Sequence, residues 1–321
     1  MNFRKLADDI MKGDRKSAAR LISLVEDEEE GCGEAMKLLY EHARGVPVLG
    51  ITGPPGVGKS TIVLEIAKRM RAQGMKLGIV AIDPTSPITG GAILGDRIRM
   101  TELFADPGVF IRSMGSRGGS GGLSSQAGSV VRILDALGCD TIIVETVGAG
   151  QTQVDIMGMA DTIVVVTMPG TGDEVQSIKA GLLEIADIYV VNKCDLTGAM
   201  RTVSDIRSML DLVEDWHGWK PPVLQTNARE GKGISELFDS IQKHHAFAGD
   251  SEHLASRKKA QLRRELQELV SRDITRKIFD NIGMKELDDM LCSMLERKSS
   301  PYSEAERMTA ELVRKKHVTA R

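Results

Sequence analysis

The sequence predicts an α/β protein built on a doubly wound, mostly parallel β-sheet. Between residues 46 and 246, seven short apolar runs of four to eight residues alternate with segments of helical periodicity. The runs are rich in Val and Ile and nearly unbroken, which is typical of strands that helices cover on both faces. A glycine-rich segment follows the first run, at the strand end where doubly wound sheets bind ligands. The expected strands are 46–52, 77–83, 109–113, 139–146, 162–168, 188–193 and 221–228.

The composition is that of an ordinary globular protein. Of its 321 residues, 41% are hydrophobic and 27% are charged, and the formal net charge is −3. A chain without a basic surplus is not expected to bind nucleic acid. No apolar run approaches the roughly 18 residues of a membrane span, and the four cysteines show no metal-ligand or disulfide spacing. We expect a cytoplasmic protein without a membrane partner.

Helical segments precede and follow the predicted sheet. In residues 1–44, Phe3, Leu6 and Ile10 share one helical face, and Asp14 can cap a second helix. Residues 45–248 carry the alternating strands and helices. Residues 249–321 contain three amphipathic helical patterns with little core of their own. Such helices either cap the sheet or form a dimerisation arm, and the pattern alone does not decide between these alternatives.

A phosphate-binding loop is predicted directly after the first strand. The segment GPPGVGKST matches the pattern G-x-x-x-x-G-K-[ST] and precedes a helical pattern, as this motif requires. Its backbone N–H groups would surround phosphate oxygens, the lysine would bring positive charge, and the serine hydroxyl would coordinate Mg²⁺. The predicted nucleotide contacts are Gly53, Pro55, Gly56, Val57, Gly58, Lys59, Ser60 and Thr61.

A second motif predicts the base of the nucleotide. Asn192, Lys193 and Asp195 follow a strand and match the guanine-reading pattern N-K-x-D. The Asp195 carboxylate can accept from guanine N1–H and from the exocyclic amine, whereas adenine offers neither donor in that arrangement, so ATP should be rejected. Asn227 and Ala228 end the last expected strand and are candidate contacts of the guanine oxygen.

Acidic residues end two other strands. Asp83 and Glu145 lie where a carboxylate can hold Mg²⁺, although Asp83 also fits an Asp-Pro turn. Asp96 either returns to the same metal or lies in a segment that covers the sheet. The N–H of Gly148 can contact the γ-phosphate and register its loss on hydrolysis. Ser60, Asp83 and Glu145 are therefore candidate metal ligands by position, and Asp96 is a further candidate if its segment returns to the metal.

The sequence also bears on the rate of hydrolysis. Ala149 stands where GTP switches often carry a water-orienting Gln, and no residue is placed as a general base. We therefore expect in-line attack of water, with Mg²⁺ and Lys59 stabilising the transition-state charge, to be slow without a partner. The polar segment that contains Gln176 and Lys179 is either an exposed loop or a third nucleotide-responsive segment.

In this order, the motifs resemble those of the methylmalonyl-CoA mutase-associated GTPases. The resemblance covers nearly the whole chain and is carried by Gly53–Thr61, Asp83-Pro-Thr-Ser-Pro, Leu94-Gly-Asp-Arg, Glu145-Thr-Val-Gly148 and Asn192-Lys-Cys-Asp195. It implies a homodimer formed through the C-terminal helices and a GTP-driven chaperone of an adenosylcobalamin-dependent acyl-CoA mutase. It also implies that the chaperone gates cofactor loading and the removal of damaged cofactor, which protects or reactivates the mutase, and that it binds no cobalamin itself. Lys59, Asp96, Glu145, Gly148 and Lys179 would then act in hydrolysis.

Two points qualify the resemblance. The segment TNAREGKG departs from the common Ser-Ala form of the guanine-cradling loop. A nickel-insertion maturation GTPase of the same class is the alternative, but it requires Cys and His clusters, and His244 and His245 are the one close pair. A P-loop kinase or transporter ATPase does not explain Asn192 and Asp195.

Overall fold

The computed structural model describes residues 1–84, 100–116, 122–146, 156–170, 185–250 and 252–318. The chain forms two compact units, residues 1–265 and residues 266–321. Their boundary falls within one long helix, α11 (Glu252–Asp280). The predicted boundary between residues 248 and 249 divides the chain differently and stays a prediction.

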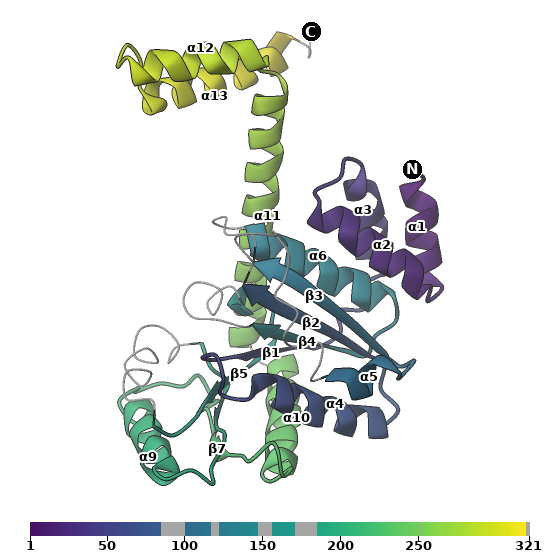
Figure 1. Cartoon of the computed structure of the whole chain (residues 1–321), viewed down its shortest axis with the longest axis vertical. Coiled ribbons are helices and arrows are strands. Elements are labelled where there is room, and N and C mark those ends of the chain that lie inside the picture. The colour runs from purple at the N-terminus through teal and green to yellow at the C-terminus, as the bar shows by residue number, and fades with distance from the viewer. Residues whose placement is uncertain (85–99, 117–121, 147–155, 171–184, 251, 319–321) are drawn as a thin grey trace. The chain divides into compact units, whose positions relative to one another are not determined.

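A seven-stranded sheet forms the centre of the first unit (Figure 1). Every neighbouring pair of strands is parallel, which confirms the predicted doubly wound α/β fold. The unbroken Val and Ile runs form these strands because both faces of the sheet are covered. The strands are β1 (Val48–Thr52), β2 (Leu77–Pro84), β3 (Val109–Ser116), β4 (Thr141–Thr146), β5 (Thr162–Thr167), β6 (Ile188–Val191) and β7 (Val223–Gln225).

The order of the strands indicates which edge of the sheet binds a ligand. It runs β3-β2-β4-β1-β5-β6-β7, so β1 lies between β4 and β5. After β1 the chain crosses to β2 on one side, and it later reaches β5 on the other. Ligands of doubly wound sheets bind outside the carboxyl ends of the strands at this reversal of order. The carboxyl end of β1 is therefore the expected binding edge.

Helices cover both faces of the sheet (Figure 1). On one face, α4 (Lys59–Ala72), α5 (Thr101–Phe104) and α10 (Ile234–Asp250) pack on alternate strand residues such as Ile51 and Ile143. On the other face, α6 (Gly122–Ala136), α9 (Ala199–Leu210) and the 3₁₀ turn η2 (Ile156–Gly158) pack on the intervening residues such as Val144 and Val165. This alternation is what a parallel strand buried on both faces requires.

The N-terminal helices extend the second of these faces. They are α1 (Phe3–Met11), α2 (Arg15–Glu26) and α3 (Cys32–His42), and they lie beside α6 (Figure 1). Leu21, Ile22 and Leu39 are fully buried in the same core as Ile133 of α6. Asp14 caps α2 as predicted, because its side chain accepts from the N–H groups of the first turn.

The second unit is helical. It contains the later part of α11 together with α12 (Met284–Leu295) and α13 (Pro301–Val318). An ion pair of 3.9 Å joins Arg307 of α13 to Glu286 of α12. Leu266, Val270 and Ile274 recur every four residues along α11 and are exposed, so this helix presents an apolar stripe. No described helix is both long and apolar enough to cross a bilayer.

Candidate functional site

The phosphate-binding loop leaves β1 and ends where α4 begins. Gly53 has φ +141°, and a Cβ there would lie 2.0 Å from the carbonyl oxygen of Val166, so only glycine lets the loop pass β5. The Lys59 side chain, 4% exposed, folds back into the loop. Its Nζ donates to the carbonyl oxygens of Gly53 and Pro54, both at 2.8 Å. The loop therefore encloses its own cation at the N-terminus of a helix, which is suited to phosphate.

A buried hydroxyl and a buried carboxylate meet beside this loop. The Ser60 Oγ donates to Glu145 Oε1 at 2.7 Å. The contact follows from the strand order, because β4 is the neighbour of β1 and Ile51 is in register with Glu145. Oxygen ligands of this kind suit a hard cation such as Mg²⁺. Their predicted role as metal ligands stays a prediction.

The other predicted metal and switch residues are described less fully. The backbone of Asp83 lies at the end of β2, in register with Gly115, but its side chain lies outside the described residues. Asp96, Gly148, Gln176 and Lys179 also lie outside them. Within the described part of the chain, no three His, Cys, Asp or Glu side chains form a group that could hold a metal. The proposed Mg²⁺ environment thus consists here of Ser60 and Glu145.

On the guanine side, Asn192 joins three loops. Its Nδ2 donates to the carbonyl oxygen of Val57 at 2.7 Å, while its Oδ1 accepts from the Thr226 hydroxyl at 2.9 Å and the Ala228 N–H at 3.1 Å. A Cβ on Gly58 would lie 2.4 Å from Nδ2 of Asn192, so glycine is needed for this close approach. Asn192 therefore fixes the phosphate loop relative to the base-reading loops.

Two base-reading loops, one that contains Asn192–Asp195 and one that contains Thr226–Ala228, make further contacts with the phosphate loop and with each other. Lys193 Nζ donates to the carbonyl oxygen of Gly56 at 2.8 Å, which crosses from the base-reading loop to the phosphate loop. Asn227 Nδ2 donates to Asp195 Oδ1 at 3.0 Å. The Asn227 side chain and the Ala228 N–H thus contact the N-K-x-D segment, and the predicted contacts of these two residues with guanine stay a prediction.

Sequence reasoning missed two hydroxyl contacts at this edge. Thr226 supports Asn192, as described above, and Thr146 Oγ1 donates to Thr52 Oγ1 at 2.8 Å. Both are buried and lie at strand ends. A threonine at the end of an apolar strand indicates such a contact in the sequence, because a buried hydroxyl requires a hydrogen-bond partner.

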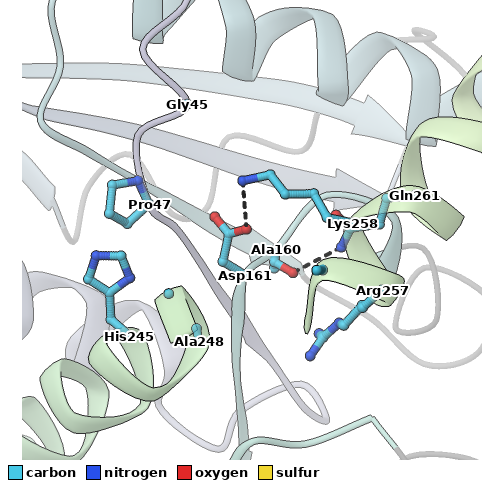
Figure 2. A pocket seen from close by; sticks show the side chains of 11 residues that line it. Gly45, Pro47, Ala160, Asp161, His245, Ala248, Arg257, Lys258 and Gln261 are labelled. Carbon is cyan, nitrogen blue, oxygen red and sulfur yellow. Dashed lines mark hydrogen bonds and ion pairs between the residues drawn. The ribbon is translucent and has the colours of Figure 1, made fainter. Parts of the chain in front are cut away.

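A pocket of about 260 Å³ lies elsewhere in the first unit (Figure 2). Its lining includes Pro47 and Asp161, which precede β1 and β5, so it lies at the amino edge of the sheet, opposite the phosphate loop. Lys258 Nζ is 3.7 Å from Asp161 Oδ1. Gln261 Nε2 donates to the carbonyl oxygens of Met157, at 2.7 Å, and Ala160, at 3.1 Å. These contacts join α11 to the sheet.

Together, the phosphate loop, the Ser60–Glu145 pair and the N-K-x-D segment on a parallel sheet define a P-loop GTPase. The family model described as methylmalonyl Co-A mutase-associated GTPase MeaB matches residues 18–283. The chain belongs to this family of GTPases, and it hydrolyses GTP.

Named relatives agree with this assignment. A putative GTPase of Pyrococcus abyssi is 46% identical over 312 residues, which are 96% of each chain. GTPase ArgK of Escherichia coli is 35% identical over 75% of this chain and 76% of its own. The mouse mitochondrial methylmalonic aciduria type A homolog is 33% identical over 80% of this chain and 66% of its own.

A solved structure has the same fold over nearly its whole length. The crystal structure of an LAO/AO transport system kinase superposes with a TM-score of 0.70 and 24% identity, over 97% of both chains. At this identity, the likeness bears on the fold alone.

Proposed function

We propose that this chain is a GTP-driven chaperone of an adenosylcobalamin-dependent acyl-CoA mutase, either methylmalonyl-CoA mutase or a close relative. The match of residues 18–283 to a mutase-associated GTPase family carries the proposal. The mouse relative, whose name refers to methylmalonic aciduria, supports it. In this proposal the chaperone uses GTP hydrolysis to gate cofactor loading, binds no cobalamin itself and works in the cytoplasm.

The nucleotide site fits Mg²⁺ with GTP or GDP. Ser60 and Glu145 supply oxygen ligands, and Asp83 and Asp96 remain proposed ligands from the sequence. When bound, Mg²⁺ would neutralise charge on the β- and γ-phosphates. Lys59 would exchange its loop carbonyl partners for phosphate oxygens and stabilise the negative charge that develops during attack by water.

We propose that the partner mutase accelerates hydrolysis. Ala149 offers no side chain that can orient water, so the free protein should turn over slowly. In this account the mutase acts through the segments that contain Gly148 and Lys179, which lie outside the described residues. Phosphate release should be measured with the full chain alone and with methylmalonyl-CoA mutase, with and without adenosylcobalamin.

We expect the mutase to increase kcat for GTP at least about tenfold, since partner proteins of other GTPases accelerate hydrolysis by orders of magnitude. An unrelated protein at equal concentration is the control. A chain that turns over rapidly alone, or a mutase that neither binds nor accelerates it, would contradict the proposal.

We also propose a homodimer formed by the C-terminal helices. Its support is the exposed stripe of Leu266, Val270 and Ile274, because apolar stripes of this kind normally pack against a partner. Light scattering after size exclusion should give twice the chain mass, and Leu266→Glu should give the monomer mass. Gln267→Glu, on the adjacent exposed position, should remain dimeric. A monomeric wild-type chain would overturn this assignment.

No observation favours nickel insertion, the alternative function. Both ring nitrogens of the buried His244 face protein atoms: Nδ1 is 2.8 Å from Thr162 Oγ1, and Nε2 is 3.4 Å from Asp187 Oδ1. This imidazole is thus engaged in the core of the first unit. The close histidine pair in the sequence is therefore not a pair of free metal ligands.

A further inference from the structure

Asn227 holds one oxygen of the Asp195 carboxylate. The distance from Asn227 Nδ2 to Asp195 Oδ1 is 3.0 Å, and Asn227 is only 7% exposed. Asp195 is exposed and follows β6 in a loop. An exposed aspartate would otherwise move among several rotamers. Because a hydrogen bond to an ionised acceptor is stronger than one between neutral groups, the amide restrains the carboxylate.

Asn227 is itself held by its backbone. Its N–H donates to the carbonyl oxygen of Lys232 at 3.0 Å, and the Lys232 N–H donates back at 3.1 Å. Gly233, with φ +73°, closes this loop, and a Cβ there would lie 2.1 Å from the carbonyl oxygen of Gln225. The loop is therefore fixed before any nucleotide arrives. A fixed donor restrains its acceptor at a lower entropic cost than a mobile donor does.

We propose that Asn227 is a positioning residue that orients Asp195 and thereby sets the preference for guanine over bases that lack the exocyclic amine. The inference rests on the proposed role of Asp195 as the guanine reader. Guanine presents N1–H and the exocyclic amine side by side, so the carboxylate must lie in one orientation to accept from both. Each carboxylate oxygen has two acceptor sites, so Oδ1 can accept from Asn227 and still accept from the base.

The amide chemistry of Asn227 suits this role. The Nδ2 group is a hydrogen-bond donor and the Asp195 carboxylate is an acceptor, so the two groups are complementary. This part of the chain is also where the sequence departs from the common Ser-Ala form, with Asn227 in the segment TNAREGKG. In this chain the Asn227 side chain reaches Asp195 from a loop closed by the Asn227–Lys232 bridge.

The test compares GTP with inosine triphosphate, whose base keeps N1–H but lacks the amine. Equilibrium dissociation constants are measured for the full chain and for Asn227→Ala. Loss of one hydrogen bond to a charged group should weaken GTP binding about tenfold and inosine triphosphate binding about threefold, so the ratio of the two constants falls.

Two further variants and a control sharpen the result. Asn227→Ser keeps a donor and should retain most of the preference for GTP. Asn227→Asp keeps the shape but places a like charge beside Asp195, so it should remove more of the preference than Asn227→Ala does. Glu230→Ala, an exposed change in the same loop, should match the wild type.

The outcomes separate this inference from the site assignment on which it rests. If Asn227→Ala and Asn227→Asp weaken both nucleotides equally, or leave the ratio unchanged, Asn227 does not position Asp195. Asp195→Ala should abolish the preference for GTP. If Asp195→Ala leaves the preference intact, the guanine assignment itself fails. If Asn227→Ala does not fold, the isosteric Asn227→Asp variant decides the question.

Discussion

The two edges of the sheet use buried polar side chains in different ways. At the carboxyl edge, Lys59 and Asn192 bind backbone carbonyl oxygens of the phosphate loop, and Ser60 binds Glu145. These contacts are made within and between loops, and a nucleotide with its metal can replace some of them. The polar side chains at the carboxyl edge are therefore available to bind a ligand.

At the amino edge, partly buried carboxylates bind the starts of the strands and the base of α11. Asp187 accepts from the N–H of Ile163 and pairs with Arg257 of α11 at 3.2 Å. Asp161 accepts from the N–H of Val48 at 2.9 Å. Although burial tends to raise the pKa of the Asp187 carboxyl, its hydrogen bond with His244 and the charge of Arg257 hold that pKa below its usual value.

The difference shows that a buried charge alone does not mark a functional site. At the amino edge each carboxylate is paired with a cation or a backbone N–H, and those pairs fix the architecture. At the carboxyl edge the partners are loop carbonyls and hydroxyls. Substitutions at the two edges should therefore separate activity from stability.

The largest effect is expected for Lys59→Ala. Removing the cation from the phosphate loop should lower kcat for GTP at least ~100-fold, since it removes a charge that acts on the transition state. The fold should persist, with an unfolding midpoint within about 3 °C of the wild type. Phosphate release and thermal unfolding measure the two quantities.

Lys68→Ala is the matched control for Lys59→Ala. Lys68 lies on the same helix, but its Nζ contacts Glu65 at 3.2 Å and Glu102 at 2.7 Å, away from the phosphate loop. Its loss should leave kcat unchanged. Wild-type hydrolysis in Lys59→Ala would show that the carboxyl edge is not the phosphate site.

Asp187→Asn should give the converse result. The side chains of Asp187 and Arg257 are 14% and 17% exposed, so the variant leaves a mostly buried guanidinium without its charge partner. We expect a loss of about 3 kcal/mol in the free energy of unfolding, with kcat unchanged. Urea denaturation and phosphate release measure these quantities. A large fall in kcat without a loss of stability would contradict the claim that the amino edge acts in stability and not in hydrolysis.

The same variant has a defined pH dependence. The pKa of Asp187 is lowered by folding, so its contribution to stability is fully present above the unfolded value of about 3.9 and is lost as the pH falls through the folded pKa. The stability difference between wild type and Asp187→Asn should therefore be constant between about pH 5 and pH 7 and shrink below about pH 4. Asp205→Asn, in an exposed pair, should change stability by less than about 1 kcal/mol.

A smaller effect is expected for Gly58→Ala. The new Cβ would lie 2.4 Å from Asn192 Nδ2 and would disturb the contact of Asn192 with Val57. GTP affinity should fall about tenfold, as for the loss of one well-formed contact. Gly74→Ala is the control, because Gly74 also has a positive φ of +81° but nothing lies within 4 Å of its Cβ position. Equal GTP affinity in Gly58→Ala and Gly74→Ala would show that the position of Asn192 does not affect nucleotide binding.

Much of the fold was predictable from the sequence. Apolar runs rich in Val and Ile predicted all seven strands, because a strand covered on both faces has no polar face to interrupt the run. The phosphate loop and the closeness of Glu145 to Ser60 followed from motif spacing and from the doubly wound plan.

Other features depend on contacts that no periodicity encodes. Asp187 and Arg257 are 70 residues apart, and their pairing depends on how α11 passes the amino edge. The Asn227 amide lies on Asp195, a placement set by the bridge to Lys232, while its predicted contact with the base stays a prediction. Side-chain contacts between distant loops follow from the tertiary structure rather than from local pattern.

The most direct test of the carboxyl edge as a guanine-nucleotide site is competition between GTP and xanthosine triphosphate on Asp195→Asn. Xanthine carries an oxygen where guanine carries its amine, so an amide at position 195 can donate to it. We predict that the wild-type chain prefers GTP and that the variant prefers xanthosine triphosphate, with kcat for its preferred nucleotide retained. A variant that still prefers GTP would contradict the account.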